Sequence, residues 1–166
     1  MIRKKKLYVR PKKAYEKIRI AEENALVKKY ALKNKREIWK TIAKVSYYRR
    51  RAKELARAST QEQAVLFTKL QELGLKTSTI ADVLDLKVED LLERRLPTVV
   101  YKKGLAHTPQ QARQMVVHKK IRIHEHVVNV PSYLVRLTQE AGITSSMSLV
   151  TKAPSKPAKE EDVSNE

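Results

Sequence analysis

One stretch of the chain, HTPQQARQMVVHKKIRI at residues 107–123, changes from a helical to a strand pattern within a few residues. Thr108 is a good helix N-cap, Pro109 suits the first helical position, and Gln111 completes a capping box. A basic patch at residues 118–120 stands where the pattern changes. The stretch therefore predicts a helix from 109 to 118 that delivers its basic residues to the start of a strand.

The predicted helix and strand each have one apolar face. Ala112, Met115 and Val116 lie at i, i+3 and i+4, which predicts a buried helical face. Residues 121–123 alternate between apolar and polar, as a half-buried strand does. Both elements are therefore expected to cover one small core.

This strand has a candidate partner nearby. We expect residues 127–130 to pair with it in the antiparallel sense, across a turn at 124–126. Pro131 ends the second strand, and residues 133–137 can add another.

The first third of the chain predicts two long helices. Pro11 can open the first, which ends near Asn34. Its loose apolar stripe consists of Tyr15, Ile18, Ala25, Leu26 and Tyr30. The second helix has a clearer face with spacings of three and four, formed by Ile38, Ile42, Val45, Tyr48, Ala52 and Leu55.

Shorter helices are expected next. Thr60 and Gln63 have the spacing of a capping box, and Gly74 stands where a glycine would end the helix. The face between them consists of Ala64, Phe67, Leu70 and Leu73. A short helix near 79–84 follows.

Pro97 interrupts the next helical pattern, at residues 88–104. Because proline inside a helix loses a hydrogen bond and clashes with the previous turn, we expect two helices. The first runs to about Arg95, and the second starts near Pro97 and ends at Gly104. Residues 99–100 are expected to receive the apolar face of the helix that follows.

Positive charge dominates the chain and is concentrated at its start. Lys and Arg number 36 against 18 Asp and Glu, and residues 1–59 alone carry 21 basic and 5 acidic side chains. Residues 98–151 form a second, smaller basic region, with 7 basic and 2 acidic side chains. Because such an excess repels itself unless a polyanion neutralises it, the expected partner is nucleic acid, with an anionic membrane surface as the weaker alternative.

Other functional classes are disfavoured. The absence of cysteine excludes disulfides and thiolate zinc sites. No apolar run approaches the roughly 20 residues of a membrane span, and the basic N-terminus has no apolar segment of a secretory signal after it. We expect no enzyme and no cofactor, because no phosphate-binding glycine loop or catalytic constellation is visible. The carboxylates Asp82, Asp85, Glu89 and Asp90 are interpreted as solvated surface.

A metal site is a separate alternative. His118, His124 and His126 cluster in the sequence near His107, and two histidines across a turn can contribute to a zinc site. No fourth ligand is evident, so we expect no metal and interpret these histidines as part of a basic, RNA-facing loop.

Beyond these patterns, LERRLPTVVYKKGLAHTPQQARQMV, followed by HKKIRIHEHVVNVPSYLV, closely resembles the S-four RNA-binding domain. RPKKAYEK, LKNKREIWK (32–40) and LDLKVEDLLERRL (84–96) extend the resemblance to the family of small-subunit ribosomal proteins S-four, in its archaeal and eukaryotic form. It covers roughly residues 3–145. The chain departs from the family at the hairpin, where glycines are common and this chain has Lys119-Lys120 and His124-Glu125.

The resemblance implies an α+β, mainly α fold: a basic N-terminal helical region plus a small S-four-type module of helices with a short, curved antiparallel sheet. We expect a basic arm (1–10) and helical domain up to residue 97, and a module at 98–150 whose first helix can begin near 88. A disordered tail at 151–166 is expected from its polar composition.

The resemblance also implies a structural constituent of the small ribosomal subunit in the cytoplasm. Such a protein binds small-subunit ribosomal RNA at a helix junction of the 5′ domain, supports assembly, and contributes to decoding accuracy and the mRNA entrance. Implied partners are this RNA, neighbouring small-subunit proteins and mRNA, with no membrane or small-molecule substrate. The alternative is a stand-alone RNA-binding assembly or processing factor that carries the same domain.

The predicted RNA-binding residues are cations, together with polar residues of the capped helix. Arginine forks suit phosphates because they donate two parallel hydrogen bonds. The predicted set is Arg3, Lys4, Lys5, Lys6, Arg10, Lys12, Lys13, Lys33, Lys35, Arg36, Lys40, Lys44, Arg49, Arg50, Arg51, Lys53, Arg95, Lys102, Lys103, Thr108, Gln111, Arg113, Gln114, His118, Lys119, Lys120 and Arg122.

Overall fold

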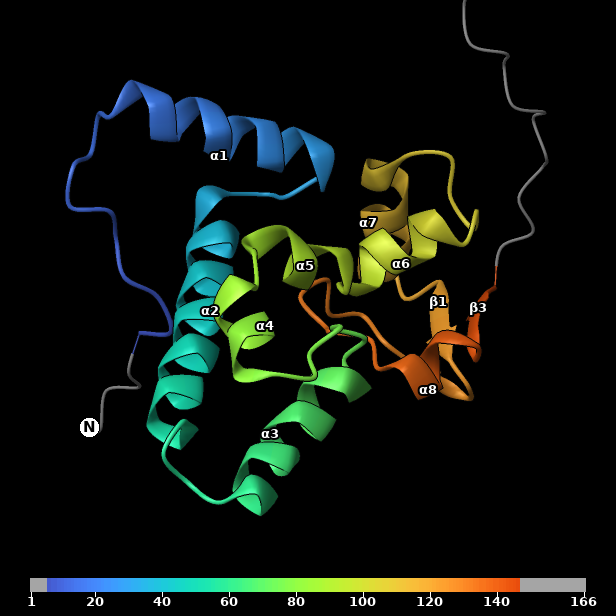
Figure 1. Cartoon of the computed structure of the whole chain (residues 1–166). Helices are drawn as coiled ribbons and strands as arrows, with labels where there is room; N and C mark the ends of the chain where they lie inside the picture. Colours follow the sequence, from blue (N-terminus) through green and yellow to red (C-terminus); the bar gives the residue numbers. More distant parts are fainter. Residues whose placement is uncertain (1–5, 147–166) are drawn as a thin grey trace, which may run out of the picture.

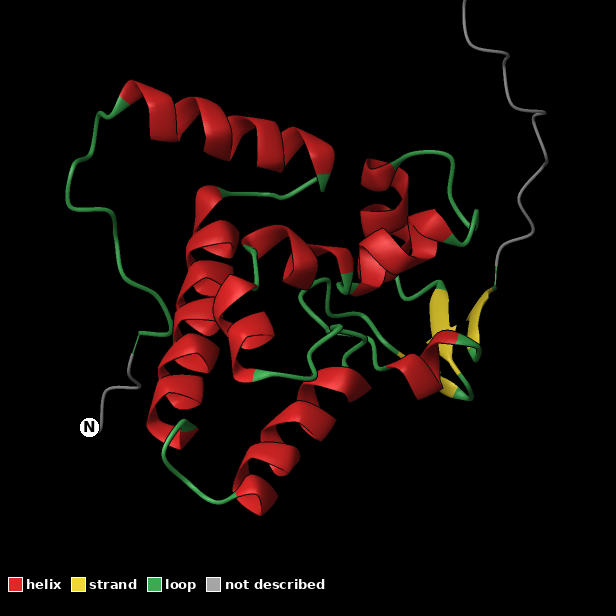
Figure 2. Ribbon diagram, in the orientation of Figure 1, coloured by secondary structure: helices red, strands yellow, loops and turns green. Residues whose placement is uncertain are grey.

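The computed structural model describes residues 6–146, which form a mainly helical protein with one small sheet (Figures 1 and 2). The expected tail at 151–166 lies outside the described residues. In chain order the elements are α1 (Lys17–Lys29), α2 (Lys35–Leu55), α3 (Thr60–Glu72), α4 (Ile80–Asp85), α5 (Val88–Glu93), α6 (Leu96–Lys102), α7 (Pro109–Val117), β1 (Ile121–Ile123), β2 (His126–Val127), α8 (Leu137–Glu140) and β3 (Ile143–Ser145). The predicted α+β, mainly α class is confirmed.

The sheet has three antiparallel strands in the order β2-β1-β3. The strand at 121–123 and its hairpin partner are confirmed, although β2 is shorter than expected and begins at His126. The strand predicted at 133–137 is wrong, because the third strand is β3 on the other side of β1. Residues 133–135 instead run alongside the junction of α5 and α6, where the Leu96 amide donates to the Tyr133 carbonyl at 2.9 Å.

The core of the C-terminal part is built by α6, α7 and the sheet. Val99 and Val100 of α6 pack with Ala112, Met115 and Val116 of α7, and all five side chains are at most 5% exposed. Ile121 and Ile123 of β1 close this core from the sheet side. The predicted apolar faces and their mutual packing are therefore confirmed.

The N-terminal part is organised around α2, which runs down one side of the molecule while α1 lies across its N-terminal end (Figure 1). Val45, Tyr48, Ala52 and Leu55 are buried as predicted against α3 and α4, while Ile42 is 42% exposed. A separate small cluster joins α1 to α2 through Tyr30, Leu32 and Ile38.

The predicted first helix is wrong at its beginning. The helix starts at Lys17 rather than Pro11, and Tyr15 and Ile18 are 92% and 74% exposed. Only the C-terminal end of α1, around Leu26 and Tyr30, finds an apolar surface to pack on. The N-terminal half of the stripe therefore has no partner within the described residues.

The capping box predicted at Thr60 is also wrong. Ser59 is the N-cap, and Gln63 instead donates its side-chain amide to the Leu55 and Ala58 carbonyls at 3.0 and 3.2 Å. Gln63 thus satisfies the end of α2 rather than the start of α3. Gly74 follows α3 with φ +78°, as expected for a helix-ending glycine.

The other predicted breaks are confirmed. The short helix expected near 79–84 is α4, and the split at Pro97 separates α5 from α6.

The N-cap predicted at Thr108 is confirmed. At the start of α7 the Thr108 hydroxyl accepts from the Gln111 amide at 3.1 Å. The Gln111 side chain accepts from the His107 amide at 2.8 Å, one residue earlier than in a standard capping box.

Candidate nucleic-acid interface

The basic patch between α7 and β1 is held by a Schellman motif. The Lys120 amide donates to the Met115 carbonyl at 2.9 Å, and the Lys119 amide donates to the Val116 carbonyl at 3.1 Å. Lys119 adopts φ +60° to make this turn, a backbone conformation that side chains other than glycine seldom adopt. The backbone of the basic joint is therefore fixed by α7, whose opposite face is buried.

Polar and basic side chains stand at this joint and on either side of it. Five of them are exposed: Gln114, His118, Lys119, Lys120 and Arg122. No ion pair joins any of the five to a carboxylate within the described residues. The Arg122 side chain is directed outward because its neighbours in β1, Ile121 and Ile123, are buried on the other face. We call these five residues the joint row; α7 and β1 hold their backbone, and no carboxylate among residues 6–146 pairs with them.

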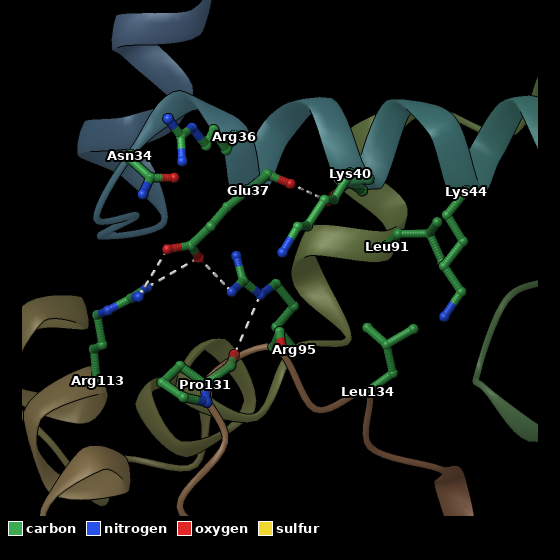
Figure 3. A pocket seen from close by; sticks show the side chains of 12 residues that line it. Asn34, Arg36, Glu37, Lys40, Lys44, Leu91, Arg95, Arg113, Pro131 and Leu134 are labelled. Carbon is green, nitrogen blue, oxygen red and sulfur yellow. Dashed lines mark hydrogen bonds and ion pairs between the residues drawn. The ribbon is translucent and has the colours of Figure 1, made fainter. Parts of the chain in front are cut away.

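Arg95 and Arg113 behave differently from the joint row. Both bind Glu37 of α2: Arg95 at 2.5 Å, and Arg113 through both of its terminal nitrogens at 2.8 and 3.1 Å. Arg95 also donates to the Pro131 carbonyl at 3.3 Å, and Arg113 donates to the Ala31 carbonyl at 3.3 Å. These contacts form a clasp between α2, the junction of α5 and α6, and α7 (Figure 3).

The clasp controls the ionisation of Glu37. Burial by itself raises the pKa of this carboxyl, but the hydrogen bonds from Arg113 and Arg95 outweigh it and hold the pKa below its ordinary value. Arg95 is only 6% exposed. Sequence reasoning missed Glu37, although a lone acid among the cations of LKNKREIWK indicates an internal ion-pair partner.

A pocket of about 420 Å³ opens beside the clasp. Lys40 and Lys44 point into it from α2, and Arg95 and Arg113 reach it from the opposite side (Figure 3). Lys44 is exposed, yet the protein around its ammonium group removes solvation and lowers its pKa, and the nearby Lys69 lowers it further.

The remaining cations of α2 divide into two groups. The first group is engaged with other protein groups. Lys35 pairs with Glu23 at 3.4 Å, and Arg49 donates to the Leu86 carbonyl at 2.7 Å. Arg50 and Arg51 lie 3.8 and 3.3 Å from Glu54. The second group has no carboxylate partner within the described residues and consists of Arg36, Lys40, Lys44 and Lys53.

The two lysines at the end of α6 also bind other groups of the protein. Lys102 pairs with Glu93 at 2.8 Å, and Lys103 donates to the Glu140 carbonyl. Both lysines belong to the predicted RNA-binding set, and contact of either with RNA stays a prediction.

Only part of the basic arm can be described. Arg3, Lys4 and Lys5 lie outside the described residues, while Lys6, Arg10, Lys12 and Lys13 are exposed. Tyr8 packs against Trp39 of α2 with ring centroids 6.0 Å apart, which anchors the arm. In the loop before α2, Lys33 is exposed as well.

None of the four carboxylates interpreted as solvated surface is buried, and three of them also have structural partners. Asp82 accepts from the amides of Ser78 and Thr79, both at 2.9 Å, and these bonds lower its pKa to about 2. Asp90 accepts from the Lys87 amide at 2.7 Å, and Glu89 pairs with Lys29.

A metal site at the histidines was an alternative interpretation of the sequence, and a membrane span was not expected. Residues 6–146 contain no group of three or more His, Asp or Glu side chains placed to hold a metal ion. No helix among them has the length and apolar character needed to cross a bilayer.

Comparison with known proteins agrees with this geometry. A family model described as S4 domain matches residues 94–140, a range that includes Arg95 of the clasp, α6, α7, the hairpin of β1 and β2, and α8. A protein of Methanococcus aeolicus named small ribosomal subunit protein uS4 is 44% identical over 133 residues, covering 76% of this chain and 75% of the relative.

Two further relatives carry the same name. The protein of Korarchaeum cryptofilum is 42% identical over 141 residues, covering 82% of this chain and 85% of the relative. The protein of Picrophilus torridus is 40% identical over 149 residues, covering 84% and 81%.

Proposed function

Because the chain belongs to the uS4 family of small ribosomal subunit proteins, we propose that it is a structural, ribosomal-RNA-binding component of the small subunit. The observation that carries this proposal is the joint row. Its cations are exposed, have no carboxylate partner in the part of the chain that the structure describes, and stand on a backbone held by a buried helix face and a Schellman motif.

A rigid row of cations suits folded RNA. RNA duplexes and junctions are recognised largely through phosphate spacing and shape rather than through base edges. Cations held in a fixed pattern lose little conformational freedom on binding, whereas a flexible tail would lose more. The joint row therefore supplies one contact surface, and the unpaired cations of α2 supply a second.

The finer assignments are part of the same proposal. We place the RNA contact at a helix junction of the 5′ domain and the protein near the mRNA entrance, with an influence on decoding accuracy. Neighbouring small-subunit proteins and a cytoplasmic ribosome complete the setting. No catalytic role is proposed for any residue, and the division into a helical domain (1–97), a module (98–150) and a tail (151–166) stays a prediction.

Binding to small-subunit ribosomal RNA as a function of salt tests the proposal. Replacing Lys120 and Arg122 with Gln removes two unpaired cations of the joint row, and should weaken binding and reduce the slope of log affinity against log salt by about 2. The matched control replaces Lys17 and Lys28, two exposed lysines of α1 outside every predicted contact, and should change neither quantity.

Sedimentation separates a constituent from a transient factor. A constituent remains with small subunits through a gradient at physiological salt, whereas a stand-alone assembly factor appears only with immature particles. If the wild-type protein fails to bind the RNA, or if both double variants bind alike, the proposed surface is wrong.

A further inference from the structure

Positive charge exceeds negative charge in the lining of the pocket beside the clasp. Its walls include the cationic side chains Arg36, Lys40, Lys44, Arg95 and Arg113, against the single carboxylate of Glu37. We call it the α2 pocket. Side chains of one sign gathered in one concave space raise the local potential and attract an ion of the opposite sign.

Glu37 cannot neutralise this charge. Both of its oxygens already accept from Arg95 and Arg113, and one also accepts from the Lys33 amide at 3.2 Å. Arg36, Lys40 and Lys44 therefore have no carboxylate within hydrogen-bond distance in the described part of the chain, and Glu37 does not pair with them. The effect of Glu37 is to hold two arginines in place rather than to fill the pocket.

A buried donor in the pocket wall also lacks a partner among residues 6–146. Arg95 is 6% exposed, and its Nη1 atom is buried with no hydrogen-bond acceptor in that described range. Buried polar atoms of this kind are uncommon, because an unmade hydrogen bond to a charged group costs stability. An acceptor oxygen entering the pocket can supply the missing bond.

The N-terminus of α2 adds to the positive potential. Asn34 is the N-cap residue and lines the pocket, but its side chain does not cap the helix. Asn34 therefore gives the first turn of this 21-residue helix no side-chain cap, although the Glu37 amide donates to the Asn34 carbonyl at 3.2 Å. Helix N-termini favour anions because their amide groups point outward and the helix dipole is positive at that end.

The pocket is larger and less polar than a bare phosphate requires. Leu91, Pro131 and Leu134 form an apolar part of its wall, next to the hydroxyl-bearing Ser132. A volume of about 420 Å³ lies in the range of pockets that hold small organic ligands. An anion that also has an apolar body fits both parts of the wall.

We propose that the α2 pocket binds one nucleotide, with its phosphate at the cationic wall and its sugar or base against Leu91, Pro131 and Leu134. This inference rests on the proposed function, since the natural source of that nucleotide is a strand of the bound ribosomal RNA. A free nucleotide presents the same chemistry, and the experiment separates the two sources. Lys40 and Lys44 contact the phosphate, and Glu37 is a positioning residue that acts through Arg95 and Arg113.

Ligand chemistry is tested first, by titrating the full chain with adenosine monophosphate, inorganic phosphate or adenosine while following backbone amide resonances. We expect adenosine monophosphate to shift the amides of residues that line the pocket, phosphate to compete with it, and adenosine to cause no comparable shift. Equal binding of adenosine, or shifts spread evenly over basic surfaces, would overturn the inference.

Matched variants then locate the site. Lys40→Gln combined with Lys44→Gln should weaken adenosine monophosphate binding about tenfold, as expected for the loss of charge-assisted hydrogen bonds. The same double change at Lys17 and Lys28 removes equal charge from exposed helix positions outside the pocket and should have less than a third of that effect. An equal loss in both variants would mean diffuse attraction and would refute the site.

The last measurement is binding to ribosomal RNA, because its result distinguishes failure of this inference from failure of the proposed function. If the wild-type protein binds the RNA and the pocket variant binds it no more weakly than the control variant, the pocket inference fails while the proposed function stands. If the wild-type protein binds adenosine monophosphate in the pocket but does not bind the RNA, the proposed function and the RNA source of the nucleotide both fail. Greater loss of RNA affinity in the pocket variant supports the RNA strand as the source.

Discussion

Arg113 of α7 and Glu37 of α2 form an ion pair at 2.8 Å although they lie 76 positions apart in the sequence. The side chains are only 20% and 17% exposed. The pair connects the basic N-terminal helix to the part of the chain that matches the S4 domain model, and Arg95 completes the clasp from the junction of α5 and α6. The two basic surfaces are therefore presented in one fixed relation.

Replacing Glu37 with Gln should lower the free energy of unfolding by about 2 kcal/mol, because two largely buried guanidinium groups lose their counter-charge. Urea denaturation of the purified variant measures this change. The control is Glu22→Gln, an exposed carboxylate of α1. An equal effect of the two substitutions would contradict the role of the clasp.

Arg113→Glu should destabilise the protein, since it places a second carboxylate beside Glu37. Arg113 and Lys120 both belong to the predicted RNA-binding set, but the ion pair of Arg113 with Glu37 makes a change at Arg113 unsuitable as a test of RNA binding alone. Lys120→Glu, at an exposed position of the joint row, should leave the melting temperature near that of the wild type. Calorimetry of the two single variants distinguishes them, and equal melting temperatures would argue against the Arg113 contact.

The stability of α4 should depend on pH through Asp82. Its pKa is lowered from 3.8 to about 2, chiefly by hydrogen bonds from the Ser78 and Thr79 amides, so its contribution is complete above pH 3.8 and is lost as the pH falls towards 2. Asp82→Asn should remove this part of the acid sensitivity. Unfolding free energies of both proteins measured across that window check the prediction, which fails if the two curves stay parallel.

Met115→Asp should unfold the C-terminal part, because it buries a charge in a position that is 5% exposed. The expected loss is about 4 kcal/mol or more. Val117 is the control on the same helix, since it is 50% exposed and its replacement by Asp leaves the core intact. Circular dichroism on heating measures both, and a normal melting curve for Met115→Asp would disprove the packing.

Lys119→Gly should stabilise the free protein by about 0.5 kcal/mol, because glycine adopts positive φ without the steric cost that a side chain brings, less its own loss of chain entropy. Lys119 has φ +60°. Lys120→Gly, one residue later and outside the left-handed region, should instead destabilise. Denaturant midpoints of the two variants provide the check, and the same sign of change in both would count against the backbone argument.

The sequence by itself determined the elements whose stability is local. The cap at Thr108, the break at Pro97 and the apolar faces of α2 and α7 were predicted because caps, proline and helical spacing act within one or two turns. It also determined the net charge and, through its family motifs, the class of partner. The missed start of α1 lies at the limit of this reasoning, since an apolar stripe predicts burial only where another element supplies a surface.

Only the tertiary structure decided which cations lack a carboxylate partner among the described residues, and which strand completes the sheet. Arg113 and Gln114 are adjacent in the sequence, yet the first lies in an ion pair with Glu37 and the second is exposed. Which cation is neutralised depends on where a carboxylate from a distant segment comes to lie, and the pairing of β3 with β1 depends on backbone hydrogen bonds between residues about twenty positions apart. Neither relationship has a local signal, because each becomes favourable only after the helices have packed.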